Sequence, residues 1–193
     1  VVGSSAPEKL ASSENRQLPY SWHPKDGLIA LATVPAINNS DIAYLSLSDG
    51  KVQNVLETTY KEDTPRFSPD GKWLAYFSTE TGGVKIYVQS TTDQKSKTVV
   101  SKESGMFPVW SANGKELYYR QGARLVSVNV SSGSNFSVGS AQVLFSGKYL
   151  TSFDVADDGS KFLMVKNEKG SMPTHLNVVL GWIDEFKRTI AAK

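Results

Sequence analysis

The sequence contains no cysteine and only two histidines among its 193 residues. Without cysteine, the chain can form neither a disulfide framework nor a thiolate metal site. The two histidines, His23 and His175, lie far apart in the sequence, whereas a zinc site needs three or four ligands at close range. We therefore interpret both histidines as structural residues and predict no transition-metal site.

Long apolar runs and concentrations of charge of one sign are also missing. No stretch approaches the roughly 18 consecutive apolar residues of a membrane-spanning helix. The 21 lysines and arginines are interleaved with 19 aspartates and glutamates, so there is no basic patch. Because nucleic-acid binding depends on concentrated positive charge, we expect neither membrane insertion nor nucleic-acid binding.

The motifs of common catalytic sites are absent as well. There is no Gly-x-Ser-x-Gly elbow of a serine hydrolase, and the glycine-containing segments lack the lysine of a phosphate-binding loop. Asp157-Asp158-Gly159 and Glu62-Asp63 offer oxygen ligands but not the spaced ligands of a calcium loop, so a turn is the favoured interpretation and calcium stays an alternative. The sequence thus predicts no catalytic residue, no cofactor and no metal ligand.

Four Asx-Gly dipeptides divide the chain at nearly regular intervals: Asp26-Gly27, Asp70-Gly71, Asn113-Gly114 and Asp158-Gly159. Their glycines are separated by 44, 43 and 45 residues. Such dipeptides tolerate the positive φ angles of tight hairpin turns. A period of this length is typical of a four-stranded propeller blade.

A continuous apolar run follows each dipeptide, as expected of a strand buried on both faces. These second strands are predicted at residues 28–31, 72–77, 116–119 and 161–165. Third strands are predicted at residues 42–47, 84–88, 124–128 and 176–180. Fourth strands are predicted at residues 52–56, 97–100 and 142–145, and the last repeat has no such pattern.

The sequence therefore predicts an all-β fold, a β-propeller of four-stranded antiparallel blades forming one domain over residues 1–193. Its repeats cover approximately residues 18–60, 61–104, 105–148 and 149–182. Three tryptophans at repeat positions are expected in the blade cores: Trp22, Trp73 and Trp110. A short helix or tail is expected over residues 183–193, because Ile183, Phe186 and Ile190 fall on one helical face.

The repeat motif, clearest in Pro65-Arg66-Phe67-Ser68-Pro69-Asp70-Gly71-Lys72, resembles that of TolB-like β-propellers, whose blades carry a Phe/Trp-Ser-Pro-Asp-Gly-Lys signature. The other repeats retain parts of it. Residues 174–187 are similar to the end of propellers fused to bacterial Ser/Thr kinases or winged-helix regulators. The resemblance implies the C-terminal part of a larger bacterial protein in the periplasm.

Propellers of this family usually have six to eight blades, whereas four repeats are present here. Three arrangements follow: a compact four-bladed ring, two chains forming an eight-bladed ring, or a fragment with exposed blade faces. Exposed apolar faces are unfavourable, so we expect a homodimer that completes an eight-bladed ring. Residues 1–10 could supply the closing strand of the fourth blade.

In propellers, ligands bind at the mouth of the central channel, which is formed by loops before each first strand and between the second and third strands. Here those loops are expected to contain five candidate residues: Glu62, Asp63, Glu103, Tyr149 and Thr151. The loops between second and third strands at residues 79–83 and 167–173 are polar, which fits a protein or peptide surface better than a deep apolar pocket. The expected partner is a protein or peptide, or a small ligand at the channel mouth.

Three functions are compatible with these features. The favoured one is a non-catalytic module for protein or ligand recognition, acting as a sensor or scaffold. The second is an accessory propeller of a serine hydrolase or peptidase, without the catalytic residues. The third is a fragment that assembles with itself and binds no ligand.

Overall fold

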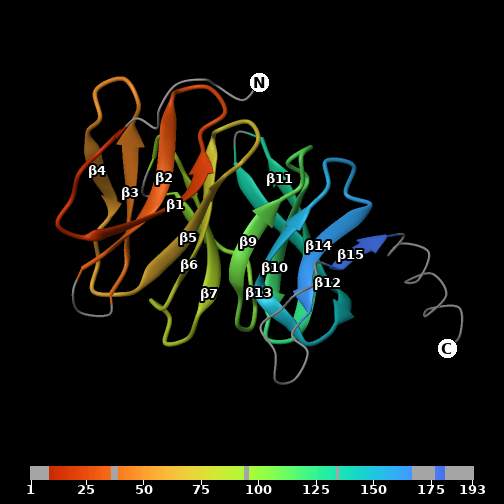
Figure 1. The fold of residues 1–193 in the computed structure, drawn as a ribbon. Coiled ribbons are helices and arrows are strands. Elements are labelled where there is room, and N and C mark those ends of the chain that lie inside the picture. Colours follow the sequence, from red (N-terminus) through yellow and green to blue (C-terminus); the bar gives the residue numbers. More distant parts are fainter. Residues whose placement is uncertain (1–8, 36–38, 94–95, 134, 167–176, 181–193) are drawn as a thin grey trace, which may run out of the picture.

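The computed structural model describes residues 9–35, 39–93, 96–133, 135–166 and 177–180, and every regular element among them is a strand. The strands form four antiparallel sheets that follow one another in chain order and stand face to face (Figure 1). Three sheets have four strands and the last has three described strands. The predicted β-propeller architecture is confirmed.

Each sheet is a meander of neighbouring strands, and we call the sheets blades 1 to 4. Blade 1 contains β1 (Arg16–Trp22), β2 (Leu28–Val34), β3 (Asp41–Ser46) and β4 (Val52–Leu56). Blade 2 contains β5 (Glu62–Phe67), β6 (Trp73–Ser78), β7 (Lys85–Ser90) and β8 (Lys97–Val99). Blade 3 contains β9 (Met106–Trp110), β10 (Glu116–Gln121), β11 (Arg124–Ser132) and β12 (Phe136–Ser146). Blade 4 contains β13 (Tyr149–Val155), β14 (Lys161–Lys166) and β15 (Asn177–Leu180).

The Asx-Gly turns have the chemistry that their sequence predicts. In blade 2, the Ser68 hydroxyl donates to Asp70 Oδ1 at 2.6 Å and accepts from the Trp73 amide at 3.0 Å. Blade 3 repeats this arrangement with Ser111 and Asn113, whose oxygens lie 2.9 Å apart. The glycine of each of the four turns has a positive φ. These polar side chains therefore replace water at backbone groups that the turn leaves unpaired.

Neighbouring blades are joined by three apolar clusters. Blades 1 and 2 share the cluster of Ala30, Ile42, Phe67, Leu74, Tyr76 and Tyr87. Blades 2 and 3 share a larger cluster that includes Trp73, Ala75 and Trp110. Blades 3 and 4 share the cluster of Tyr118, Leu125, Leu144, Phe153, Phe162 and Met164. Because β6 and β10 carry apolar side chains on both faces, blades 2 and 3 each contribute to two of these clusters.

The first strands of the blades lie nearest the axis and contact one another in chain order: β1 with β5, β5 with β9, and β9 with β13. Among the described residues, no comparable contact joins β1 to β13. The outer face of blade 1 is covered differently, because Ala11 packs against Ile29, Leu31, Ala43 and Leu45. The segment just before β1 thus lies against blade 1.

Some sequence predictions differ from the structure. Trp22 was expected in a blade core, but 65% of its surface is exposed because no blade precedes blade 1 in the described chain. Strand β12 is longer than predicted, since its hairpin with β11 extends to the pair Ser132 and Phe136. The predicted C-terminal helix, His175 and residues 1–8 of the predicted closing segment lie outside the described residues.

His23 joins the turns of blades 1 and 2. Its Nδ1 accepts the Asp26 amide at 3.0 Å, so Nε2 carries the proton and donates to the Gly71 carbonyl at 3.0 Å. The ring also packs edge-on against Phe67, with centroids 4.8 Å apart. Gly71 has a φ of 79°, and a β-carbon there would lie 2.5 Å from His23 Nε2.

We expect Gly71→Ala to destabilise the fold more than Gly82→Ala. Gly82 has a nearly equal φ of 78°, but its position has no atom within 4 Å of a β-carbon. In both variants, an alanine in the left-handed conformation costs about 1–2 kcal/mol of stability. Only Gly71→Ala also displaces the His23 ring. Urea unfolding measures the two free energies of unfolding. Equal losses would show that the His23 contact contributes nothing.

Candidate functional site

A small cavity lies where the first strands of all four blades converge. Its volume is about 110 Å³. It is lined by Tyr20 of β1, Thr64 and Arg66 of β5, Phe107, Pro108 and Val109 of β9, and Ser152 and Phe153 of β13. We call it the axial cavity. Every blade contributes at least one residue to it.

The backbone is strained at the wall of the axial cavity. Thr64 has a φ of 54° and Phe107 a φ of 56°. Both residues precede a proline, occupy the same position of successive repeats, and lie where the pairing register shifts. Positive φ is a genuine outlier for a β-branched or bulky residue and costs about 1–3 kcal/mol. Such strain commonly marks functional positions, so it points to the cavity wall.

Polar groups are held within this mostly apolar wall. Arg66 Nη1 donates to the Tyr20 carbonyl at 2.7 Å, which fixes the guanidinium between β1 and β5. The Thr64 hydroxyl is buried and has no hydrogen-bond partner among the described residues. Burial, followed by the nearby Asp63 carboxylate, raises the pKa of Tyr20 to about 12. At neutral pH the residues around the cavity therefore include the neutral phenol of Tyr20, the buried hydroxyl of Thr64 and the guanidinium of Arg66.

A second cavity of about 220 Å³ lies at the turn end of the axis. Trp22, Pro24, Pro69 and Trp110 contribute to it, and it shares Arg66 and Val109 with the axial cavity. The two cavities are thus adjacent along the axis. The exposed Trp22 belongs to the wider one.

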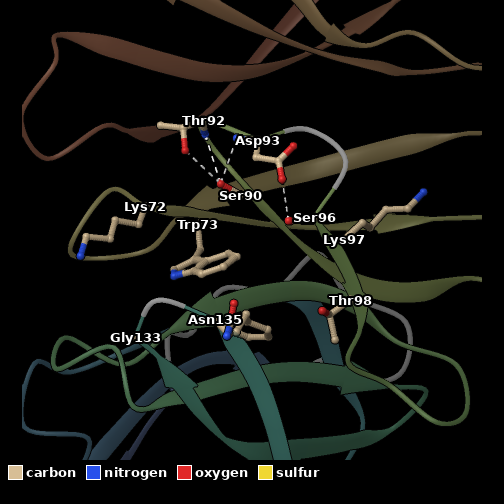
Figure 2. A pocket seen from close by; sticks show the side chains of 11 residues that line it. Lys72, Trp73, Ser90, Thr92, Asp93, Ser96, Lys97, Thr98, Gly133 and Asn135 are labelled. Carbon is tan, nitrogen blue, oxygen red and sulfur yellow. Dashed lines mark hydrogen bonds between the residues drawn. The ribbon is translucent and has the colours of Figure 1, made fainter.

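A groove of about 710 Å³ separates the outer parts of blades 2 and 3 (Figure 2). Trp73 and Phe136 form its apolar part, with ring centroids 5.2 Å apart. Its hydroxyl groups mainly bond within the wall, because Ser90 Oγ accepts the amides of Thr92 and Asp93 at 3.3 and 3.1 Å. The groove therefore offers fewer free polar groups to a ligand than its polar lining suggests.

Two of the five predicted site residues lie at the start of β5 instead of in a loop, because Glu62 and Asp63 pair with β6. Glu62 is only 1% exposed, and its Oε1 accepts the hydroxyls of Thr58 and Ser78 at 2.8 and 3.1 Å. Its Oε2 has no partner among the described residues. Burial raises the pKa of Glu62. Asp63 accepts the Thr64 amide at 2.7 Å and so supports the strained backbone.

The other three predicted residues belong to blades 3 and 4. Glu103 is exposed and accepts a hydrogen bond from Gln121 Nε2 at 2.8 Å. Tyr149 and Thr151 lie in β13, not in a loop, and the Tyr149 ring packs edge-on against Phe145 with centroids 6.0 Å apart. None of the five lines the axial cavity.

The residues that line the axial cavity are not among those predicted from the sequence. Asp63 and Thr151 each immediately precede a lining residue, so the predicted region was close in the chain but displaced by one position. A signal was present in Thr64-Pro65 and Phe107-Pro108, which place a proline at the same position of two repeats. Arg66 has no equivalent in the other repeats and could not be selected by periodicity.

Two further kinds of site concern the described residues, namely metal sites and membrane-spanning helices. No group of three or more His, Asp or Glu side chains in this part of the chain is placed to hold a metal ion. Asp158, in the candidate calcium segment, accepts the Ser160 amide and hydroxyl at 2.9 and 2.7 Å, an arrangement typical of a turn. No helix among the described residues is long and apolar enough to span a membrane.

Comparison with known proteins gives partial matches. No family model matches the chain. The chain is 32% identical over 93 residues to the Tol-Pal system protein TolB of Desulfosudis oleivorans, covering 42% of this chain and 21% of that protein. It is 38% identical over 72 residues to dipeptidyl-peptidase 5 of Porphyromonas gingivalis, covering 33% and 10%. The chain thus spans about a fifth and a tenth of the lengths of these relatives.

Among solved structures, TolB from Acinetobacter baumannii superimposes with a TM-score of 0.60 at 21% identity. The match covers 80% of this chain and 38% of that one. This similarity concerns the fold, and the four blades correspond to part of that longer chain.

We expect Thr64→Gly to stabilise the fold by about 1 kcal/mol. Glycine adopts positive φ without steric cost, so the substitution releases backbone strain and removes a buried hydroxyl without a partner. The matched control, Thr98→Gly in β8, should destabilise the fold by about 0.5–1 kcal/mol because its strand needs no such conformation. Urea unfolding compares both variants with the wild type. A destabilised Thr64→Gly variant would mean that Thr64 is not strained.

We expect Glu62→Gln to be more stable than the wild type at pH 7, by about 1 kcal/mol. A raised pKa in the folded state means that the folded chain binds this proton more tightly than the unfolded chain, so the wild type loses stability as pH rises through the folded pKa. The advantage of Glu62→Gln should therefore shrink toward pH 4. Unfolding free energies at pH 4 to 7 test this, with Glu103→Gln as an exposed control. A constant difference across this range would contradict the prediction.

Proposed function

We propose that this chain, whose repeats and fold are those of TolB-like β-propellers, is a non-catalytic module that recognises a protein partner at its axis. The observation that carries the proposal is the convergence of all four first strands on one cavity with a strained wall. The strained backbone of this wall lowers the stability of the fold, and strain of this kind commonly persists at binding sites.

The contents of the axial cavity limit what it can accept. A volume of about 110 Å³ equals that of only three or four water molecules at roughly 30 Å³ each. Arg66 and the Thr64 hydroxyl provide donors, while Phe107 and Phe153 provide apolar contact. These groups suit one short acidic or amide side chain projecting from a peptide segment. A protein loop or tail that inserts such a side chain is the proposed ligand.

The context of the module is proposed from the same family. TolB-like propellers act outside the cytoplasm, so we propose a periplasmic location and a role as sensor or scaffold within a larger bacterial protein. We also propose that two copies associate to complete an eight-bladed ring, because Trp22 of blade 1 and Leu163 of blade 4 are 65% and 37% exposed and exposed apolar surface favours association.

A second candidate is an accessory propeller of a peptidase, which would gate access to a separate catalytic domain. The match of 72 residues to dipeptidyl-peptidase 5 favours it. The two candidates differ in gene organisation. A hydrolase domain encoded next to this chain would support the peptidase role, and a kinase domain or a membrane segment upstream would support the sensor role.

The recognition function can be tested with a phage-displayed library of random 12-residue peptides, selected on the immobilised chain. Selected peptides should contain an essential Asp, Glu, Asn or Gln. Arg66→Ala and Thr64→Val should each weaken their binding at least about tenfold, the effect of losing one hydrogen bond of about 1.4 kcal/mol. Isothermal titration calorimetry with synthetic peptides measures the affinities.

Lys25→Ala, an exposed change in the turn of blade 1, is the control and should leave binding unchanged. The proposal fails if no peptide is selected, or if the selected peptides bind the Arg66 and Thr64 variants as tightly as the wild type. Thermal unfolding of each variant confirms that the fold is retained.

A further inference from the structure

Arg120 is a buried cation for which the described residues provide no anion. It lies in β10 and is only 5% exposed. Its Nη2 donates to the Gly122 carbonyl at 3.2 Å, but its Nε and Nη1 are buried without a hydrogen-bond partner among the described residues. None of the ion pairs in this part of the chain includes Arg120. The guanidinium therefore has both an unbalanced charge and unused donors.

The same position is apolar in the other three blades. In every blade the last residue of the first strand pairs with a residue of the second strand, and Arg120 lies three positions after that residue in blade 3. The equivalent residues of blades 1, 2 and 4 are Ala32, Phe77 and Val165. Ala32 and Phe77 are 0% and 3% exposed. Apolar side chains thus satisfy the packing at this position, and packing alone does not account for an arginine.

The Arg120 side chain lies on the face of blade 3 that packs against blade 4. Strand β10 pairs with β11 without a register shift, so Tyr118 and Arg120 share one face of the sheet. The Tyr118 ring packs edge-on against Phe162 of blade 4, with centroids 5.1 Å apart. In blade 2 the equivalent residue, Phe77, likewise contacts Phe107 of the following blade. Arg120 is therefore enclosed between two blades, and it does not line the axial cavity.

Burial makes this charge unfavourable. It lowers the pKa of Arg120, although the interaction with Tyr149 acts in the opposite direction. A guanidinium nevertheless stays protonated in proteins, because its ordinary pKa lies above about 12. A buried charge that lacks a counter-charge is strongly destabilising. A water molecule would accept hydrogen bonds from Arg120 but leave its charge unbalanced, whereas an anion would satisfy both.

We propose that Arg120 binds a small monovalent anion, a halide or a carboxylate, between blades 3 and 4. The available donors are Nε and Nη1, the two groups without a partner. A single negative charge balances the single guanidinium, and the burial of both nitrogens restricts the ligand to a few atoms. The anion would stabilise the packing of blade 4 on blade 3. This site is separate from the axial cavity and does not depend on peptide recognition there.

Urea unfolding tests the site when chloride or formate replaces methanesulfonate, a bulkier monovalent anion, at constant ionic strength. An anion that binds only the folded chain stabilises it by mass action, so the equilibrium constant of unfolding should fall about tenfold at an anion concentration ten times Kd. Stabilisation by chloride identifies a halide as ligand, and stabilisation by formate identifies a carboxylate.

Arg120→Met removes the charge and keeps a long side chain, so it should abolish the dependence on chloride or formate. In methanesulfonate it should be at least as stable as the wild type, because it no longer buries an unpaired charge. Arg124→Met, at an exposed arginine of β11, is the matched control and should keep the full dependence. If Arg120→Met does not fold, Arg120→Phe supplies the side chain that blade 2 has at this position.

NMR gives a second readout that does not depend on stability. The chloride signal should broaden, or the formate signal should show saturation transfer, in the presence of the wild type and of Arg124→Met but not of Arg120→Met. The inference is overturned if neither anion stabilises the wild type relative to methanesulfonate, as expected if water occupies the site. It is also overturned if Arg120→Met responds to the anions as the wild type does.

Discussion

The structure depends on the packing of each blade face against the next. A four-stranded sheet with apolar side chains on both faces cannot be stable alone, because one face at least would be exposed to water. Stacking buries both faces of the central blades, and residues such as Phe67 and Trp110 lock each blade to its predecessor. In blade 1, Ala11 packs against the face that no other described blade covers.

Convergence of the blades also creates the candidate site. Each first strand belongs to one blade, but its inner edge meets the other first strands at the axis. Pairing with β6 fixes the two ends of β5, and pairing with β10 fixes the two ends of β9. Between these ends, the register shifts and the positive φ angles of Thr64 and Phe107 place both residues in the cavity wall. Rigid packing between blades therefore supports a local strain that an isolated hairpin would relax.

Local sequence was sufficient for much of the fold. Asx-Gly dipeptides at intervals of about 44 residues identified the hairpins, and apolar runs after them identified the second strands, because turn chemistry and burial on both faces act over a few neighbouring residues. Candidate residues of the mouth were placed only approximately. Glu62 illustrates the reason, since its hydrogen bonds to Thr58 and Ser78 bury a carboxylate that its polarity suggested was open to a ligand.

The sequence by itself determined the repeat, the turns and the all-β architecture, since each follows from periodicity and from contacts between residues close in the chain. Only the tertiary structure decided which repeated residues are buried and which line the axis. Trp22 and Trp110 share a repeat position, yet one is exposed and the other buried, because burial depends on whether another blade lies against that face. Arg66 likewise lines the axial cavity while its guanidinium bonds to the Tyr20 carbonyl, 46 residues away in the chain.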